Sequence, residues 1–334
     1  MNRIFPCAAL TLAAITPLTL RGADFPENPN RFSFGPRFGF NFKADFQNSA
    51  PYFNPVSPGP ASGGANHTYD DGYVRVDSSG NLGGRTSNWG YQNSSQVAGD
   101  AMQFHAIHSS SSTAVADDPQ YGAELTYQRV LGRVFSSSSA NWGLEVGLGY
   151  TDLDLRKNTD GTAPVTTDTY PLNGVLPPGP GYNGPFDGPG PLLGDTPTRT
   201  TTSANRRSRQ KLSGDLFSIR LGPFVEWNLT SKLSVAGSLG ITVAPTYVDY
   251  DFSESVSVAG GDTYTASGHS SKSKLLYGPY LGGMIRYDFS KHWGVYVGAQ
   301  FQNLRDLKQS IGSRTARLDQ GATVYGTVGV SWRF

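Results

Sequence analysis

The chain has 334 residues, of which only 16% are charged, and its 27 basic side chains nearly balance its 26 acidic ones. This length is too great for one small domain but suits a single larger one with long loops, and the near-neutral balance gives no sign of a nucleic-acid partner. The single cysteine, Cys7, excludes a disulfide framework, and no run of eighteen apolar residues after residue 24 suggests a transmembrane helix.

The first 23 residues have the pattern of an export signal. Arg3 supplies a positive end, an apolar stretch runs from Ile4 to Leu20, and Gly22 and Ala23 form a small-residue exit. A membrane anchor is the alternative, but the apolar stretch is shorter than the ~20 residues that span a bilayer. We therefore expect residues 1–23 to be a signal peptide and residues 24–334 to form one barrel domain.

Alternation between apolar and polar residues predicts eight strands after the signal. In the first strand, 31–47, phenylalanines from Phe32 to Phe46 share one parity, and mostly small or charged residues share the other. A soluble sandwich with a phenylalanine-rich core is the alternative for this pattern. The other seven strands are expected at residues 121–128, 142–151, 217–227, 233–243, 275–289, 293–302 and 321–334.

The connections between these strands alternate between long and short. Long loops are expected at about 48–118 and 157–211, and a shorter one at 252–272, whereas tight turns are expected near 228–231 and 290–292. Within the first loop, Tyr73 to Val76 and Ala101 to Ile107 are candidates for extra strands. Outer-membrane barrels have brief periplasmic turns and longer outer loops, so this asymmetry favours such a barrel.

The closing segment GATVYGTVGVSWRF, which ends in Phe334, alternates strictly between apolar and mostly polar residues. With the loop asymmetry, it resembles small bacterial outer-membrane β-barrels of the OmpA/OmpX or opacity-protein type. The resemblance implies an all-β, antiparallel, up-and-down transmembrane barrel in the cell outer membrane, with eight strands, or ten or more as the alternative. It also implies that Phe334 belongs to the signal read by the barrel assembly machinery.

The polar parity of the strands carries charges of both signs. An eight-stranded barrel is just wide enough to be filled by side chains, and a buried charge is costly unless it is paired. We therefore predict an interior ion-pair network and no wide pore, with a water-filled channel as the alternative. The predicted members are Arg37, Lys43, Arg220, Arg286, Asp45, Glu124, Glu145, Glu226 and Asp288.

A basic cluster at the end of the second long loop is the best candidate binding site. Its members are Arg206, Arg207, Arg209 and Lys211. At the outer rim they would meet the phosphates of lipopolysaccharide, with which arginine forms paired hydrogen bonds. A solvated loop end without a ligand is the alternative.

Pieces of an enzyme site are present but match no family motif. They are His105, His108 and His269, with Ser270 and the Asp70–Asp71 and Asp117–Asp118 pairs. Histidines three apart on a strand face opposite ways, so His105 and His108 do not form a metal site together. We interpret these residues as solvated loop residues and expect no enzyme activity, cofactor or metal.

The sequence thus favours a non-enzymatic barrel with a side-chain-filled interior, which supports envelope integrity and presents its loops for adhesion or ligand contact. Its expected partners are outer-membrane lipid and lipopolysaccharide, the assembly machinery and an unknown surface ligand. A narrow porin is the first alternative. A lipid A-modifying or proteolytic barrel is the second, and it requires His105, His108 or His269 to meet a serine or a carboxylate.

Overall fold

The computed structural model describes residues 28–48, 64–77, 85–107, 111–135, 139–183, 193–258 and 262–334. The signal peptide expected at residues 1–23 and the candidate His108 lie outside these ranges. Within them, no helix is long and apolar enough to cross a membrane.

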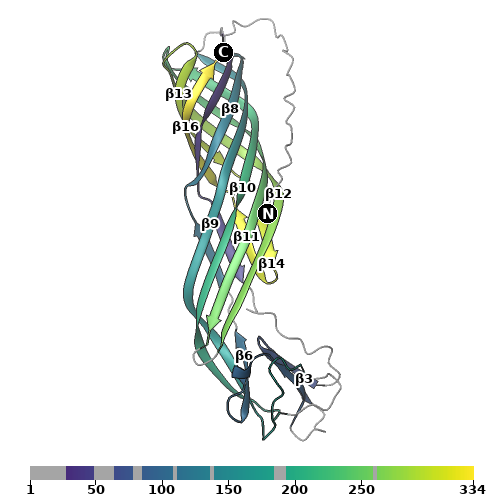
Figure 1. Cartoon of the computed structure of the whole chain (residues 1–334). Helices are drawn as coiled ribbons and strands as arrows, with labels where there is room; N and C mark the ends of the chain where they lie inside the picture. Colours follow the sequence, from purple (N-terminus) through teal and green to yellow (C-terminus); the bar gives the residue numbers. More distant parts are fainter. Residues whose placement is uncertain are drawn as a thin grey trace.

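Eight strands form a closed antiparallel ring (Figure 1). Each strand pairs with the next one of the ring along the chain, and the first pairs with the last, from Arg31 opposite Arg333 to Phe40 opposite Val324. The prediction of an eight-stranded, up-and-down antiparallel barrel is confirmed. The ring strands are β1 (Asn30–Phe40), β8 (Gln120–Arg133), β9 (Ala140–Pro171), β10 (Thr198–Asn228), β11 (Leu233–Ser257), β12 (Thr263–Asp288), β13 (Trp293–Gln302) and β16 (Thr323–Arg333).

The outer surface of the ring is an apolar belt. Leu144, Leu221, Leu239, Leu281 and Val297 are among the exposed side chains that cover it. Tryptophans lie near the short turns, and exposed tyrosines lie toward the opposite end of the belt. Aromatic girdles of this kind mark the two interfaces of a bilayer. The girdle residues are Trp142, Trp227, Trp293 and Trp332 at one end, and Tyr121, Tyr247 and Tyr277 at the other.

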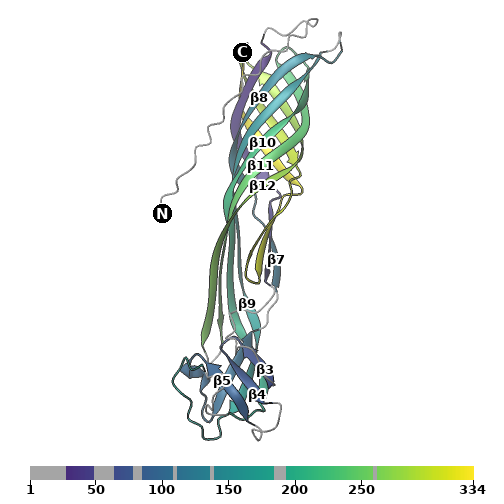
Figure 2. The same cartoon turned by 90° about the vertical axis from the view of Figure 1, so that its right-hand side faces the viewer.

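Four of the ring strands continue far beyond this belt. They are β9, β10, β11 and β12, with 32, 31, 25 and 26 residues. On the opposite side of this extension, the short ring strands give way to a second sheet in the order β14-β15-β2-β7 (Figure 2). The strands of that sheet are β14 (Leu307–Ile311), β15 (Arg314–Asp319), β2 (Lys43–Asn48) and β7 (Ser111–Ala116).

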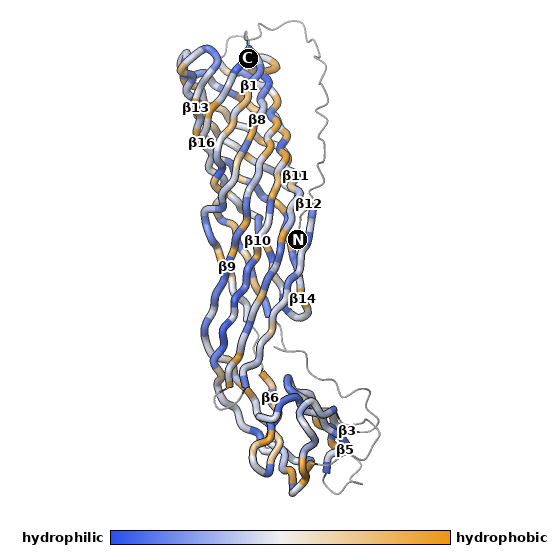
Figure 3. The backbone as a smooth tube through the Cα atoms, viewed as in Figure 1, coloured by the Kyte–Doolittle hydropathy of each residue, from blue (hydrophilic) through white to orange (hydrophobic). Residues whose placement is uncertain are grey.

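An apolar core fills the space between the extended strands and the second sheet. The outer surface of the extension is polar. Figure 3 shows that hydrophilic residues are more frequent along the extension of β9 and β10 than along the ring. The long loops predicted at 157–211 and 252–272 are therefore wrong over most of their length, because paired strands occupy them. The core includes Phe42, Phe46, Leu153, Leu155, Leu212, Leu216, Val248, Tyr250, Leu276, Leu307 and Leu318.

The buried side chains change from odd-numbered positions in β1 to even-numbered positions in β2. Asn41 adopts a left-handed conformation (φ 63°), and the Asp118 carboxylate accepts hydrogen bonds from the backbone N–H groups of Asn41 and Phe42, at 2.7 and 3.3 Å. Such a one-residue irregularity moves every later side chain to the other face. Lys43 is therefore exposed and Asp45 only partly buried, so the prediction that they face the interior is wrong.

A small folded tip lies at the end of the molecule far from the carboxy terminus (Figure 1). It contains a three-stranded sheet of β3 (Gly64–Tyr69), β4 (Gly72–Asp77) and β5 (Thr86–Tyr91), the short helix η1 (Ser94–Gln96), and β6 (Ala101–Ile107), which pairs with the far end of β9. The extra strands predicted around residues 73–76 and 101–107 are present as β4 and β6. The first long connection is therefore a folded unit, with a core of Tyr69, Val74, Trp89, Tyr91, Met102, Phe104, Tyr170, Leu172 and Leu193.

Three ring strands contain a glycine followed by a proline, at Gly35-Pro36, Gly222-Pro223 and Gly278-Pro279, and neighbouring backbone approaches each of these glycines closely. A Cβ atom on Gly222 would lie 1.9 Å from the backbone oxygen of Leu239, and one on Gly35 would lie 1.9 Å from that of Val328. Because real Cβ atoms do not approach a backbone atom so closely, glycine is required at both positions.

We predict that Gly222→Ala destabilises the folded barrel by about 1–3 kcal/mol, because the methyl group forces β10 and β11 apart. The measurement is the urea midpoint of the barrel in vesicles, with heat-modifiable gel migration as the readout of folding. Gly237→Ala is the matched control, since the nearest atom to its Cβ is the Gly282 oxygen at 3.9 Å. Equal midpoints for the two variants would contradict the prediction.

Candidate functional site

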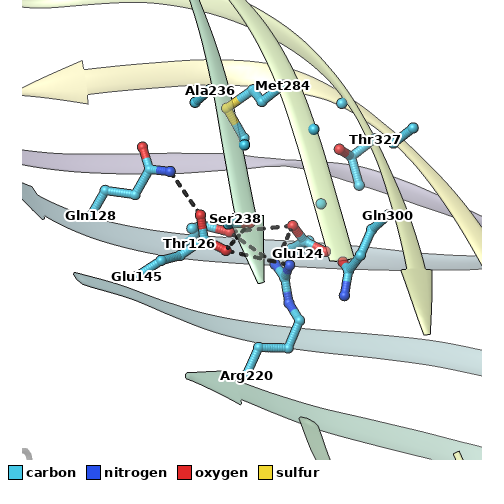
Figure 4. A pocket seen from close by; sticks show the side chains of 15 residues that line it. Glu124, Thr126, Gln128, Glu145, Arg220, Ala236, Ser238, Met284, Gln300 and Thr327 are labelled. Carbon is cyan, nitrogen blue, oxygen red and sulfur yellow. Dashed lines mark hydrogen bonds and ion pairs between the residues drawn. The ribbon is translucent and has the colours of Figure 1, made fainter. Parts of the chain in front are cut away.

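The centre of the ring interior contains a buried ion-pair cluster. Nη2 of Arg220 on β10 lies 2.6 Å from Glu124 Oε1 on β8, and Nη1 lies 3.6 Å from Glu145 Oε1 on β9. Arg37 on β1 approaches the other oxygen of Glu124 at 3.7 Å. Each of these side chains is at most 4% exposed. Figure 4 shows Arg220 reaching toward the two carboxylates.

A second cluster surrounds Glu226, nearer the short turns. Its Oε1 accepts hydrogen bonds from Arg286 at 2.7 Å, from Arg31 at 3.0 Å and from the Ser234 hydroxyl at 2.7 Å. At the rim, Arg333 lies 3.4 Å from Asp288. Arg31 and Arg333 are additional members of the network beyond the predicted ones, and both share the inward parity of their strands.

Gln128 connects the two clusters. Its amide nitrogen donates to Glu145 at 2.7 Å, and its oxygen accepts from Arg286 at 2.9 Å. The network thus crosses the lumen from β1 and β8 to β12. Because water screens it little, the removal of one partner leaves an uncompensated charge.

Two small cavities lie beside this network in the part of the chain that the structure describes, and the one nearer the short turns, of about 70 Å³, is lined by Arg31, Gln128 and Glu226. The other, of about 20 Å³, lies between Arg220, Ser238 and Gln300, which is room for about one water molecule. On the side toward the extension, the Arg37 guanidinium stacks over the Tyr325 ring at 3.4 Å. Tyr325 in turn packs against Phe42 of the apolar core. The lumen is thus filled first by charged and then by apolar side chains.

The predicted basic cluster is divided between two faces of β10. Arg206 is buried and pairs with Glu254 at 2.9 Å, and Glu254 also accepts from Arg314 at 2.7 Å. Arg207 and Arg209 are exposed on the outer face, with Lys211 partly exposed beside them. The single four-residue cluster is therefore wrong, because this segment is a strand with a period of two and not a loop.

The three outward cations belong to a polar surface just beyond the apolar belt. In the strand register, Arg156, Lys211, Asp251 and His269 lie side by side on four successive strands from β9 to β12. They line a groove of about 620 Å³ together with Arg209 and their neighbours. We name this surface, defined by Arg156, Arg209, Lys211, Asp251 and His269, the rim groove.

His269 meets both a carboxylate and a hydroxyl in the rim groove. Its Nδ1 lies 2.7 Å from Asp251 Oδ1, and its Nε2 lies 3.2 Å from Ser271 Oγ. The serine is Ser271 and not the predicted Ser270, because positions two apart share a face of the strand. The arrangement depends on cross-strand register, which the sequence alone did not give.

His105, Asp70 and Asp71 are buried in the tip, so their interpretation as solvated loop residues is wrong. Nδ1 of His105 lies 2.6 Å from Asp71, whose carboxylate also accepts a hydrogen bond from the Tyr264 hydroxyl at 2.9 Å. Burial and the Asp71 charge raise the pKa of Tyr264 above its ordinary value. Asp70 accepts a bond from the Ile107 N–H at 2.6 Å. These contacts attach the tip to β12 and bring no serine or threonine hydroxyl to the imidazole among the hydrogen bonds of the described residues.

Phe334 lies outward beside the ring seam. Its backbone exchanges hydrogen bonds with Asn30, and its ring stacks on Trp332 with a centroid distance of 4.5 Å. In the parts of the chain that the structure describes, no three or more His, Cys, Asp or Glu side chains are grouped to hold a metal ion.

A closed antiparallel ring, an apolar belt between aromatic girdles and a charged interior define a transmembrane β-barrel of the small outer-membrane type. This class of protein resides in the bacterial outer membrane. The assignment to this class is based on the strand pairing and the exposed apolar side chains of the chain.

No protein-family model and no curated protein matches the chain. Three similar solved structures are Ail of Yersinia pestis in complex with the heparin analogue sucrose octasulfate, OprG of Pseudomonas aeruginosa and the outer membrane protease OmpT of Escherichia coli. Their identities to this chain are 9%, 12% and 11%, and their TM-scores are 0.24, 0.32 and 0.30. The alignments cover 91%, 93% and 94% of this chain and 99% of each of the others.

We predict that Arg220→Met destabilises the barrel by about 3–5 kcal/mol, because it leaves the buried Glu124 and Glu145 without their shared cation. The measurement is the urea midpoint in vesicles. Arg207→Ala, on the exposed face of the same strand, is the control and should leave the midpoint unchanged. The double variant Arg220→Met/Glu124→Gln should recover part of the loss, and an unchanged midpoint in Arg220→Met would contradict the prediction.

The tip contains a buried carboxylate that makes its stability depend on pH. Arg199 donates two hydrogen bonds of 2.7 Å to the buried Asp168, and Tyr69 donates a third of 2.7 Å. The Arg199 hydrogen bonds above all lower the pKa of Asp168 below its ordinary value. A depressed folded-state pKa stabilises the fold above the unfolded pKa, and this stability disappears as the pH falls through the folded pKa.

We therefore expect the tip to lose stability in acid sooner than the ring, and Asp168→Asn to be less stable at neutral pH but less sensitive to acid. The measurement is urea unfolding between neutral pH and pH ~3, spanning the ordinary Asp pKa. Unfolding of the tip is monitored by the fluorescence emission of Trp89 in a variant in which the ring tryptophans are replaced by phenylalanine. Equal acid sensitivity in Asp168→Asn and its parent would refute the assignment.

Proposed function

We propose that the chain is a closed, non-conducting barrel that anchors a stiff extension and a folded tip outside the cell. In this role it supports envelope integrity and presents the tip for adhesion or contact with a surface ligand. The observation that supports the proposal is the filled lumen, in which the ion-pair network is followed by the apolar core.

The length of the extension supports a role in presentation. A transmembrane strand needs only ~10 residues, so a strand of 32 residues leaves about 20 beyond the membrane. At ~3.3 Å per residue and a tilt of ~40°, these carry the tip roughly 50 Å outward. Pairing of β9 to β12 with one another and an internal core make this part stiff.

We propose further that the rim groove contacts the phosphates of lipopolysaccharide. Arg156, Arg209 and Lys211 face outward just beyond the tyrosine girdle of the belt, at the level where lipid headgroups lie. Arginine suits phosphate because its planar guanidinium donates paired hydrogen bonds. Nearby carboxylates such as Asp154, which accepts a bond from Arg156 at 2.8 Å, keep the surface mixed in charge.

The narrow porin is the competing function, and conductance separates the two. We expect the refolded mature protein to produce no discrete openings in planar bilayers, because the cavities of about 20 and 70 Å³ beside the ion-pair network hold only a few water molecules. A known porin in the same bilayer serves as the positive control, and heat-modifiable migration verifies folding. Stable openings of uniform size would overturn the proposal and make the chain a porin.

A further inference from the structure

Asp251, His269 and Ser271 form a chain of hydrogen-bonding partners on the outer face of β11 and β12. Asp251 and His269 lie directly opposite each other in the register, and Ser271 follows two residues along the same face. One ring nitrogen faces the carboxylate at 2.7 Å and the other faces the hydroxyl at 3.2 Å. A neutral imidazole with its proton on Nδ1 would therefore present Nε2 as the base for the Ser271 hydroxyl.

The cations of the rim groove lie beside this trio. Lys211 is directly opposite Asp251 on the other side of β11, and Arg209 is two residues further along β10. His269, Asp251, Lys211 and Arg209 all line the same groove. An anionic group held by the two cations would therefore lie beside the imidazole.

The trio is placed at the level of lipid headgroups. The last outward aromatic of β11 is Tyr247, and Asp251 follows four residues later, which corresponds to about 10 Å along the tilted strand. The side chains of His269 and Asp251 are 59% and 48% exposed. A lipid bound in the groove would cover them and exclude water, which strengthens electrostatic interactions in the site.

We propose that Ser271, His269 and Asp251 hydrolyse carboxylic esters of phosphate-bearing lipids in the outer leaflet. Lys211 and Arg209 hold the lipid phosphate, so the substrate class rests on the proposed phosphate contact. The ester chemistry rests on the trio alone.

The reaction takes place in two steps. In the first, Ser271 Oγ bonds to the ester carbonyl carbon while His269 Nε2 takes the hydroxyl proton, and the carbonyl–alkoxy bond breaks as the lipid alkoxide takes that proton from His269. In the second, water attacks the acyl-serine carbon and gives a proton to His269, which returns it to Ser271 Oγ as the fatty acid leaves. Asp251 holds the Nδ1 proton and stabilises the imidazolium that forms in each step.

The first test is covalent labelling of the full mature protein in detergent micelles with a fluorophosphonate probe, which reacts with activated serines. We expect Ser271 to be the labelled residue by mass spectrometry, and labelling to disappear in His269→Asn and after heat unfolding. Ser273→Ala, two residues further along the same face, is the matched control and should label normally. Absence of label on Ser271 in the folded protein would overturn the proposal.

The second test is turnover in vesicles that contain lipid A or, separately, phosphatidylglycerol, with a neutral p-nitrophenyl ester as a third substrate. We expect Ser271→Ala to reduce fatty-acid release by about 1000-fold or more, and the two lipids to distinguish the glycolipid from a phospholipid source. His292→Asn at a periplasmic turn is the control histidine. Equal release by Ser271→Ala and its parent on all three substrates would overturn the assignment.

The cations are tested separately from the trio. Arg209→Ala and Lys211→Ala should raise KM for the phosphate-bearing lipids at least about tenfold more than they raise KM for the neutral ester. If neither variant shows this difference while Ser271→Ala abolishes hydrolysis, the phosphate contact is wrong and the ester chemistry stands. If the cations alter lipid binding but no ester is cleaved, the phosphate contact stands and the ester chemistry is wrong.

Discussion

Closure of β16 on β1 is the constraint on which the rest of the structure depends. In hydrocarbon, each backbone N–H and C=O group must find a partner within the protein, and only a ring without edges provides one for every strand. Eight strands give a ring whose interior is just wide enough for side chains to fill. The inward charges therefore have no bulk water to solvate them, and Arg220 and Glu226 are stable there only because each contacts opposite charges.

The long strands β9 to β12 pass through both the ring and the extension, and the apolar face of each strand changes from outward in the ring to inward in the extension. In the ring part of β9, Leu144 and Leu148 point outward and Glu145 points inward, whereas beyond Tyr150 it is Leu153 that points inward and Asp152 that points outward. The backbone alternation continues unchanged through this point. The molecule thus has a membrane barrel with a polar interior and, beyond the membrane, a pair of sheets with an apolar core, and the two parts are joined without a break in hydrogen bonding.

This exchange explains which parts of the fold could be predicted from the sequence. The ring strands have one clear apolar face, so their positions, number and pairing order follow from alternation. At residue 151 the apolar residues change from even to odd positions, and the Thr- and Ser-rich segment 198–205 has hardly any apolar face, so both look like loops. The Asn41 irregularity and the contact of His269 with Asp251 depend on backbone conformation and register, which no local pattern contains.

The exchange also leaves polar side chains exposed on the outer surface of the extension. Because the extension keeps its apolar side chains inside, Asp251, His269 and Ser271 contact one another and the solvent and do not pack in the core. Such exposed residues contribute little to stability, and substitutions there leave the ladder between β11 and β12 intact. The exposed contact between His269 and Asp251 thus differs from the similarly short His105–Asp71 contact, which is buried and attaches the tip to β12.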